Sequence, residues 1–202
     1  MQKTSENNHQ KIIRLTECAV MLALSIVLSF VEVWKMPMGG GITLLSMLPV
    51  CLIAVKYGTK AGLSTAFLFG AFHLFKGLAS GDVFVYCATA FAVAVCVLFD
   101  YLVPFSALGL SGIFRKKGTP GVCAGITLGI FIRFLCHFIT GVVIWAQFAP
   151  EGQSKFVYSL LYNGQYMLPE CVITVAGAVI LLRIPRVRAL IGMASAKETE
   201  SK

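Results

Sequence analysis

Four residues at four-residue spacing stand out in an apolar segment of the chain: Arg133, His137, Gly141 and Trp145. On an α-helix this spacing places the side chains in one slowly drifting row on a single face. A charged side chain at the centre of a membrane-spanning helix costs about 3 kcal/mol, so the row needs a compensating interaction. His137 and Trp145 would be about 12 Å apart along a helix, the length of a small two-ring ligand. The bare backbone of Gly141 between them would let a flat ring approach.

Other polar and aromatic residues flank this row. Asp100 and Tyr101 lie in the preceding apolar segment, Tyr158 and Asn163 begin the following one, and Trp34 lies in an early loop. An amide offers a donor and an acceptor together, as the edge of a heteroaromatic ring requires. Cation–π contact with Trp contributes about 0.5–2 kcal/mol, and a carboxylate neutralises the ligand charge. The set therefore predicts a site for a small aromatic cation rather than a catalytic site.

Two ionisable residues, Arg133 and Glu170, lie well inside apolar segments. An ion pair is the simplest compensation for a charge in the membrane interior. We therefore expect Arg133 to pair with Asp100 or Glu170, and the sequence leaves the choice open. His137 is either a ligand contact or a histidine hydrogen-bonded within the protein.

The composition indicates an integral membrane protein. Of 202 residues, 57% are hydrophobic and 13% are charged, and the mean hydropathy is +0.83; soluble domains carry about 25% charged residues. The net charge of +8 comes from short Lys/Arg clusters between apolar stretches, which argues against a nucleic-acid partner. Seven cysteines scattered through apolar segments do not form a disulfide framework.

We expect an all-α protein with six transmembrane helices and both termini in the cytoplasm. The expected spans are residues 12–31, 42–55, 61–78, 83–114, 122–147 and 157–182. They form a membrane domain, 12–184, between a polar segment, 1–11, and a basic and polar tail, 185–202. Basic clusters at 11–14, 56–60, 115–118 and 183–188 fall on one side of these spans, which the positive-inside rule assigns to the cytoplasm. The fourth span is longer than one straight crossing requires, so either Pro104 kinks it or its boundaries lie elsewhere.

Ala19 and Ala23 give the first span a thin face, meaning one with only small side chains, so another helix can approach it closely. That helix is either in the same chain or in a partner subunit.

The chain resembles the substrate-binding (S) component of an energy-coupling factor (ECF) vitamin transporter, specifically the thiamine-binding member. The resemblance covers nearly the whole chain. It rests on Trp34, on DYLVPFSALGLSGIF, which contains Asp100 and Tyr101, and on HFITGVVIW and YSLLYNG with EGQS between them.

The resemblance implies a thiamine site near the outer leaflet. Trp145 would stack on a ring of thiamine, and His137, Tyr158 and Asn163 would surround that ring. The acid of the Asp100–Tyr101 pair would interact with the positive charge or the aminopyrimidine of thiamine. Trp34 would cover the bound ligand. Some relatives carry Glu where this chain has Asp100, which leaves open how far the shorter acid reaches. A lid containing the glycines at 39–41 could hinge over the ligand.

The resemblance also implies the assembly. A transmembrane coupling subunit would meet the Ala19/Ala23 face, two cytoplasmic ATPases would drive transport, and the chain would be a multi-pass protein of the cell membrane. Thiamine is then the transported ligand, with no cofactor, metal or catalytic residue expected. The sequence has no GxxxxGK[ST] phosphate loop, so ATP hydrolysis would come from partners.

Three alternatives remain at this point. The nearest is an S component for another small vitamin. A membrane enzyme using His73, His137 and an acid is disfavoured because the sequence has neither HExxH nor GxSxG. A purely structural membrane subunit would not need aromatic and polar groups converging at one leaflet.

Overall fold

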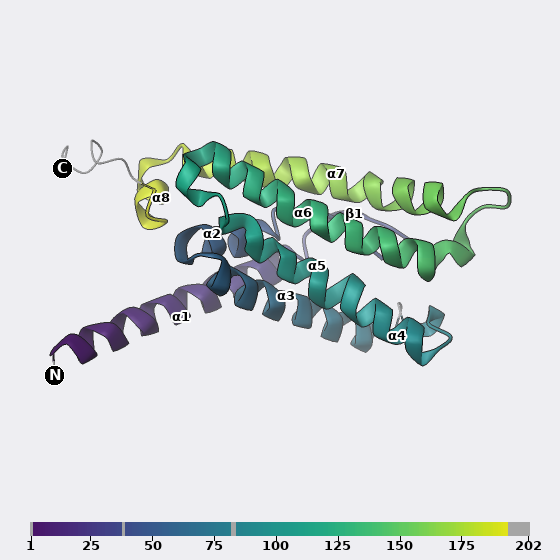
Figure 1. The fold of residues 1–202 in the computed structure, drawn as a ribbon, viewed down its shortest axis with the longest axis horizontal. Coiled ribbons are helices and arrows are strands. Elements are labelled where there is room, and N and C mark those ends of the chain that lie inside the picture. Colours follow the sequence, from purple (N-terminus) through teal and green to yellow (C-terminus); the bar gives the residue numbers. More distant parts are fainter. Residues whose placement is uncertain (1, 38, 82–83, 194–202) are drawn as a thin grey trace.

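The computed structural model describes residues 2–37, 39–81 and 84–193. Its helices are α1 (Gln2–Leu28), α2 (Leu48–Tyr57), α3 (Thr59–Ser80), α4 (Ala90–Cys96), α5 (Val103–Ser106), α6 (Gly118–Val143), α7 (Lys155–Leu182) and α8 (Pro185–Leu190). Strands β1 (Glu32–Lys35) and β2 (Gly41–Thr43) form an antiparallel hairpin between α1 and α2. The long helices run along the long axis, and the start of α1 and helix α8 lie at the same end of the bundle (Figure 1).

Four helical segments in the described part of the chain are long and apolar enough to cross a membrane: Thr59–Ser80, Ala90–Gly112, Arg115–Val143 and Lys155–Leu182. They correspond to the third to sixth predicted spans and confirm a helical protein with several apolar spans. The second predicted span, 42–55, is wrong as one helix because residues 41–43 form β2. The helix α2 has 10 residues, or about 15 Å, too short to cross alone.

The predicted boundaries also differ from the observed ones at the first and fourth spans. The helix α1 begins at Gln2, so the polar segment before residue 12 continues the first helix. The tail begins with α8, while residues 194–202 lie outside the described residues. The fourth span begins at Ala90 and not at residue 83.

The core lies around the short helix α2, which packs against α1, α3 and the 3₁₀ segment Ala107–Gly112. Phe69, Leu108 and Ile126 are fully buried there. Large apolar side chains also point outward, with Phe75 71% and Val172 68% exposed. Helices that are apolar on both faces are typical of membrane spans.

Glycines allow α3 to lie directly against the segment Ala107–Gly112. A Cβ atom on Gly109 would collide with backbone atoms of Gly62 and Leu63, whereas a Cβ on Gly164 of α7 would meet open space. We therefore expect Gly109→Ala to destabilise the protein by about 1–3 kcal/mol through overpacking. The control Gly164→Ala should be neutral or mildly stabilising because alanine favours helix. Melting temperatures in detergent test this, and equal melting of the two variants would contradict such a close crossing.

Candidate ligand-binding site

A cavity of about 700 Å³ lies among α3, α6, α7, the hairpin and the segment around Asp100. Pockets for small ligands typically have volumes of about 300–1,000 Å³. Seven of the eight residues predicted to contact the ligand line it: Asp100, Tyr101, His137, Gly141, Trp145, Tyr158 and Asn163. The structure therefore brings together side chains from three predicted spans.

Asp100 is positioned by an irregular stretch of helix. It lies in the π-helical segment Val97–Leu102, directly before α5 and Pro104. Proline cannot donate to the carbonyl four residues earlier, here that of Asp100, and its ring clashes with that carbonyl. A π-helical turn relieves this conflict, and such turns often occur at functional sites. The irregularity predicted at Pro104 is thus present as a widened turn that carries the acid.

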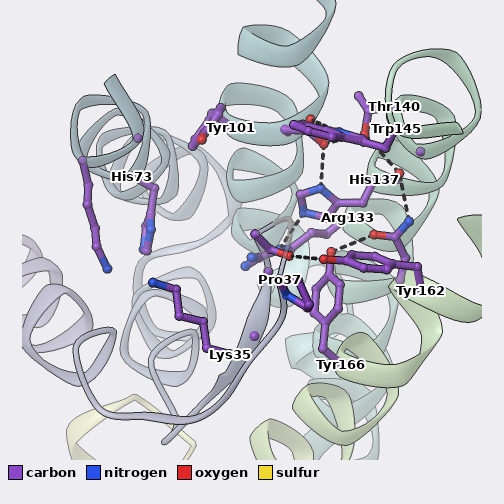
Figure 2. A pocket seen from close by; sticks show the side chains of 18 of the residues that line it. Lys35, Pro37, His73, Tyr101, Arg133, His137, Thr140, Trp145, Tyr162 and Tyr166 are labelled. Carbon is purple, nitrogen blue, oxygen red and sulfur yellow. Dashed lines mark hydrogen bonds and ion pairs between the residues drawn. The ribbon is translucent and has the colours of Figure 1, made fainter. Parts of the chain in front are cut away.

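The Asp100 carboxylate is the centre of the polar network in the cavity, and its partners His137, Thr140 and Trp145 are labelled in Figure 2. It accepts hydrogen bonds from His137 Nδ1 at 3.0 Å, Thr140 Oγ1 at 2.5 Å and Trp145 Nε1 at 3.2 Å. Asp100, although shorter than the Glu that some relatives carry, therefore contacts all three partners directly. A carboxylate has about four acceptor positions, so one remains open to a ligand.

Trp145 lies in the cavity but not on the predicted helix. The helix α6 ends at Val143, and Trp145 begins a 3₁₀ turn, Trp145–Phe148, so the helical row ends before the indole. The indole is held by its hydrogen bond to Asp100 and by edge contact with Tyr86, with 6.2 Å between ring centroids. These contacts, rather than helical spacing, orient the ring.

Gly141 serves helix packing. A Cβ at this position would collide with Ser159 Oγ of α7 and would lie 3.1 Å from Asn163 Nδ2. Ser159 fills the space that a side chain at Gly141 would take, while Gly141 itself lines the cavity, so the approach of a flat ring to its backbone stays a prediction. The missing side chain lets α6 and α7 approach closely at the cavity wall.

Asn163 is tied into the same contact between α6 and α7. Its Nδ2 donates to the His137 carbonyl at 3.2 Å and to the Ser159 carbonyl at 3.0 Å, and its Oδ1 accepts from Tyr166 Oη at 2.8 Å. The amide is buried. It holds the backbone of His137 and the phenol of Tyr166 in place, and its Oδ1 can accept one more hydrogen bond.

Arg133 has no carboxylate partner among the described residues. Their ion pairs join Lys56 to Glu17, Lys76 to Glu32 and His137 to Asp100. The predicted pairing of Arg133 with Asp100 or Glu170 is therefore wrong. His137 lies between Arg133 and Asp100, and Glu170 Oε1 accepts instead from Thr43 N at 2.5 Å and Thr43 Oγ1 at 2.7 Å.

The hairpin lies against the cavity, but the Trp34 side chain does not line it. Trp34 is 58% exposed and lies on β1, where it pairs with Ile42. Gly39, Gly40 and Gly41 do line the cavity, and Tyr162 Oη donates to the Gly39 carbonyl at 3.1 Å. Gly39 and Gly40 have φ angles of 88° and 80°, which glycine adopts without strain.

The model of the family described as Thiamine transporter protein (Thia_YuaJ) matches residues 15–189. The chain belongs to this family. Among curated relatives, the thiamine transporter ThiT of Bacillus subtilis (strain 168) is 34% identical over 181 residues, 83% of this chain and 88% of that protein. ThiT of Lacticaseibacillus paracasei is 26% identical, over 87% and 90% of the two chains.

A solved structure of ThiT from Listeria monocytogenes shares the fold of this thiamine transporter family member. Its sequence is 25% identical, the TM-score is 0.73, and the match covers 88% of this chain and 98% of the other. The resemblance identified from sequence motifs is thus confirmed. The family is one of transport proteins, which rules out the enzyme alternative.

Sequence reasoning missed several residues that line the cavity of this family member: Tyr86, Thr140, Tyr162 and Tyr166. Tyr162 and Tyr166 continue from Tyr158 at four-residue intervals on α7, and adjacent rings in this row have centroids 5.8 and 6.4 Å apart. That spacing was visible in the sequence. Thr140 and Tyr86 gave no comparable signal, because the fold alone brings them to Asp100 and Trp145.

Proposed function

We propose that this chain is the thiamine-binding S component of an ECF-type vitamin transporter, which binds thiamine from outside and releases it inward. The observation that carries the proposal is the joint placement of the Asp100 carboxylate and the Trp145 indole in one cavity of a thiamine transporter family member. Thiamine has a thiazolium cation and an aminopyrimidine. These two rings need an acid, an aromatic face and hydrogen-bonding groups.

Each part of the network can serve one of these needs. The indole of Trp145 offers a π-face to a ring, and Asp100 keeps one acceptor position for the amino group or the positive charge. The row of Tyr158, Tyr162 and Tyr166 forms an aromatic part of the cavity wall. His137, bonded through Nδ1 to Asp100, holds the carboxylate in position.

We further propose a multi-pass arrangement in the cell membrane with six helices, in which the termini face the cytoplasm. Basic clusters lie in the turn between α2 and α3, at the start of α6 and in α8, at the same end of the bundle as the start of α1 (Figure 1). The α6–α7 loop, next to Trp145, lies at the opposite end. The positive-inside rule then places Trp145 toward the exterior.

The exposure of Ala19 and Ala23 supports a partner on α1. Both residues are exposed, so the packing of α1 within the chain does not use this thin face. Small residues allow another helix to approach closely in a membrane. We propose that the transmembrane coupling subunit contacts this face and that two cytoplasmic ATPases supply the energy.

The hairpin is the proposed lid. Tyr162 holds it through the Gly39 carbonyl, and Lys76 pairs with Glu32 at 3.4 Å. Both contacts are local and can exchange when the hairpin moves about its glycines. Such a movement would carry Trp34 toward the ligand.

Tryptophan fluorescence tests the proposal because the chain has two Trp residues, Trp34 and Trp145. Titration of the purified protein with thiamine should quench fluorescence in the nanomolar range. In Trp34→Phe, which retains Trp145, most of the quenching should remain. In Trp145→Phe, any remaining change reports movement of Trp34 and so tests closure of the hairpin.

Two results would overturn the assignment. Absence of thiamine binding to the wild-type protein by calorimetry as well as fluorescence would remove thiamine as the ligand. Tighter binding of another vitamin would favour the alternative of an S component with a different substrate.

A further inference from the structure

The hairpin is held against α7 at its root, the end of β2 at Thr43. Glu170 Oε1 accepts two hydrogen bonds from this one residue, from the backbone N–H at 2.5 Å and from Oγ1 at 2.7 Å. Since the Thr43 hydroxyl donates its proton to Glu170, it accepts from Ser46 Oγ at 2.6 Å. Glu170 is only 4% exposed, so water does not compete for these bonds. Thr43 pairs with Glu32 of β1, so the contact with Glu170 positions both strands.

A second contact between the root and α7 lies about two turns farther along the helix. Leu45 packs against Gly177, where a Cβ atom would lie 2.5 Å from Leu45 Cδ2. Leu45 has a φ angle of 62°, a left-handed conformation that is uncommon for a bulky residue. Such a conformation persists only where the surrounding structure holds it. Thr43 and Leu45 therefore form the fixed end of the hairpin.

The other end of the hairpin rests on the same helix through weaker contacts. Tyr162 Oη donates one hydrogen bond to the Gly39 carbonyl, and a Cβ atom on Gly40 would lie 2.8 Å from Tyr166 Cζ. Both glycines can change their backbone conformation at little cost. Tyr162, Tyr166 and Glu170 follow one another at four-residue intervals, so one face of α7 contacts both ends of the hairpin.

We propose that Glu170 is a positioning residue that fixes the root of the hairpin, so that the hairpin closes over the ligand in one defined place. The inference rests on the proposed function, in which the ligand is thiamine and the hairpin is the lid. Glu170 acts through Thr43, and movement is confined to the segment that contains Gly39 and Gly40. A loosened root would hold the closed hairpin less firmly. It should therefore speed thiamine dissociation more than it slows association.

Stopped-flow tryptophan fluorescence with thiamine tests this in a set of variants. Glu170→Leu removes the acceptor and should raise the dissociation rate about tenfold, as expected for lost hydrogen bonds to a charged group. Glu170→Gln keeps an acceptor oxygen and should stay within about threefold of wild type. Thr43→Val removes only the hydroxyl donor and should lie between Glu170→Leu and wild type. The double variant should release thiamine no faster than Glu170→Leu, because both substitutions break the same contact.

Thr174→Val is the matched control for Thr43→Val. Thr174 is fully buried one turn beyond Glu170, and its hydroxyl has no hydrogen-bond partner within the described part of the chain. Its rates should equal those of wild type. A dissociation rate in Glu170→Leu equal to that of wild type, or equal to that of Glu170→Gln, would overturn the assignment.

Hydrogen exchange of the Thr43 amide separates this inference from the proposed function, because it needs no ligand. The amide should exchange about tenfold faster in Glu170→Leu than in wild type, the factor expected for one hydrogen bond to a charged group. Unchanged exchange would contradict the contact.

A second pair of variants decides the matter if Glu170→Leu does not fold. Thr43→Ser keeps the hydroxyl and should match wild type, whereas Thr43→Val should release thiamine faster. Equal rates in these two variants would overturn the assignment. Failure of wild-type protein to bind thiamine would instead contradict the proposed function.

Discussion

Replacing Asp100 by Asn is expected to weaken thiamine binding about 100-fold, the largest effect of any single substitution in the cavity. The carboxylate is 12% exposed and accepts from His137, Thr140 and Trp145. An amide of the same shape removes the negative charge and replaces one acceptor with a donor. Loss of a charged interaction in a desolvated site costs about 3 kcal/mol, or slightly more than a factor of 100. Calorimetric titration with thiamine measures it.

Glu32→Gln is the control for this substitution. Glu32 also lines the cavity, but its carboxylate pairs with Lys76 on the hairpin side. We expect its thiamine affinity to stay within about threefold of wild type, since partly exposed ion pairs contribute little. Similar losses in the two variants would show that cavity charge in general, rather than Asp100, determines affinity.

Replacing Trp145 by Ala is expected to lower thiamine affinity about 30-fold or more. The indole contributes a π-face for a cationic ring, worth about 0.5–2 kcal/mol when desolvated, together with apolar contact area. Its Nε1 also donates to Asp100, so truncation loosens the acid as well. Titration calorimetry avoids dependence on the lost fluorophore.

Trp145→Phe separates these contributions. It keeps an aromatic face but cannot donate to Asp100, so its affinity should lie between those of wild type and Trp145→Ala. An alanine variant that binds as well as wild type would show that the ligand does not stack on this ring. The ligand would then have to lie elsewhere in the cavity.

The membrane class and most of the predicted residues that line the cavity followed from the sequence. The apolar composition and the length of the spans depend on solvation, which acts residue by residue and needs no tertiary contact. The spacing of His137 relative to Arg133 is local helix geometry, and both side chains line one cavity. The tyrosine row on α7 has the same four-residue spacing in the sequence, but it was not among the predicted contacts.

Tertiary structure alone decided how these residues are used. Asp100 reaches its partners because Pro104 follows a widened turn, and Trp145 reaches Asp100 because α6 ends before it. Gly141 lets α6 approach α7 closely, and only the packed bundle shows that Ser159 fills the space of its missing side chain.

Arg133 shows the same limit most clearly. The free-energy cost of placing a charged side chain in the membrane predicts that the charge has a partner. It does not predict which neighbouring residue the fold brings to it. Here Thr43 of the hairpin takes one Glu170 oxygen, and His137 takes the Asp100 carboxylate. The guanidinium is left without a carboxylate partner among the described residues because the hairpin holds one oxygen of Glu170 and because His137, one turn along α6, contacts Asp100. Local periodicity thus determined which groups are present, and long-range packing decided which of them remain free to bind.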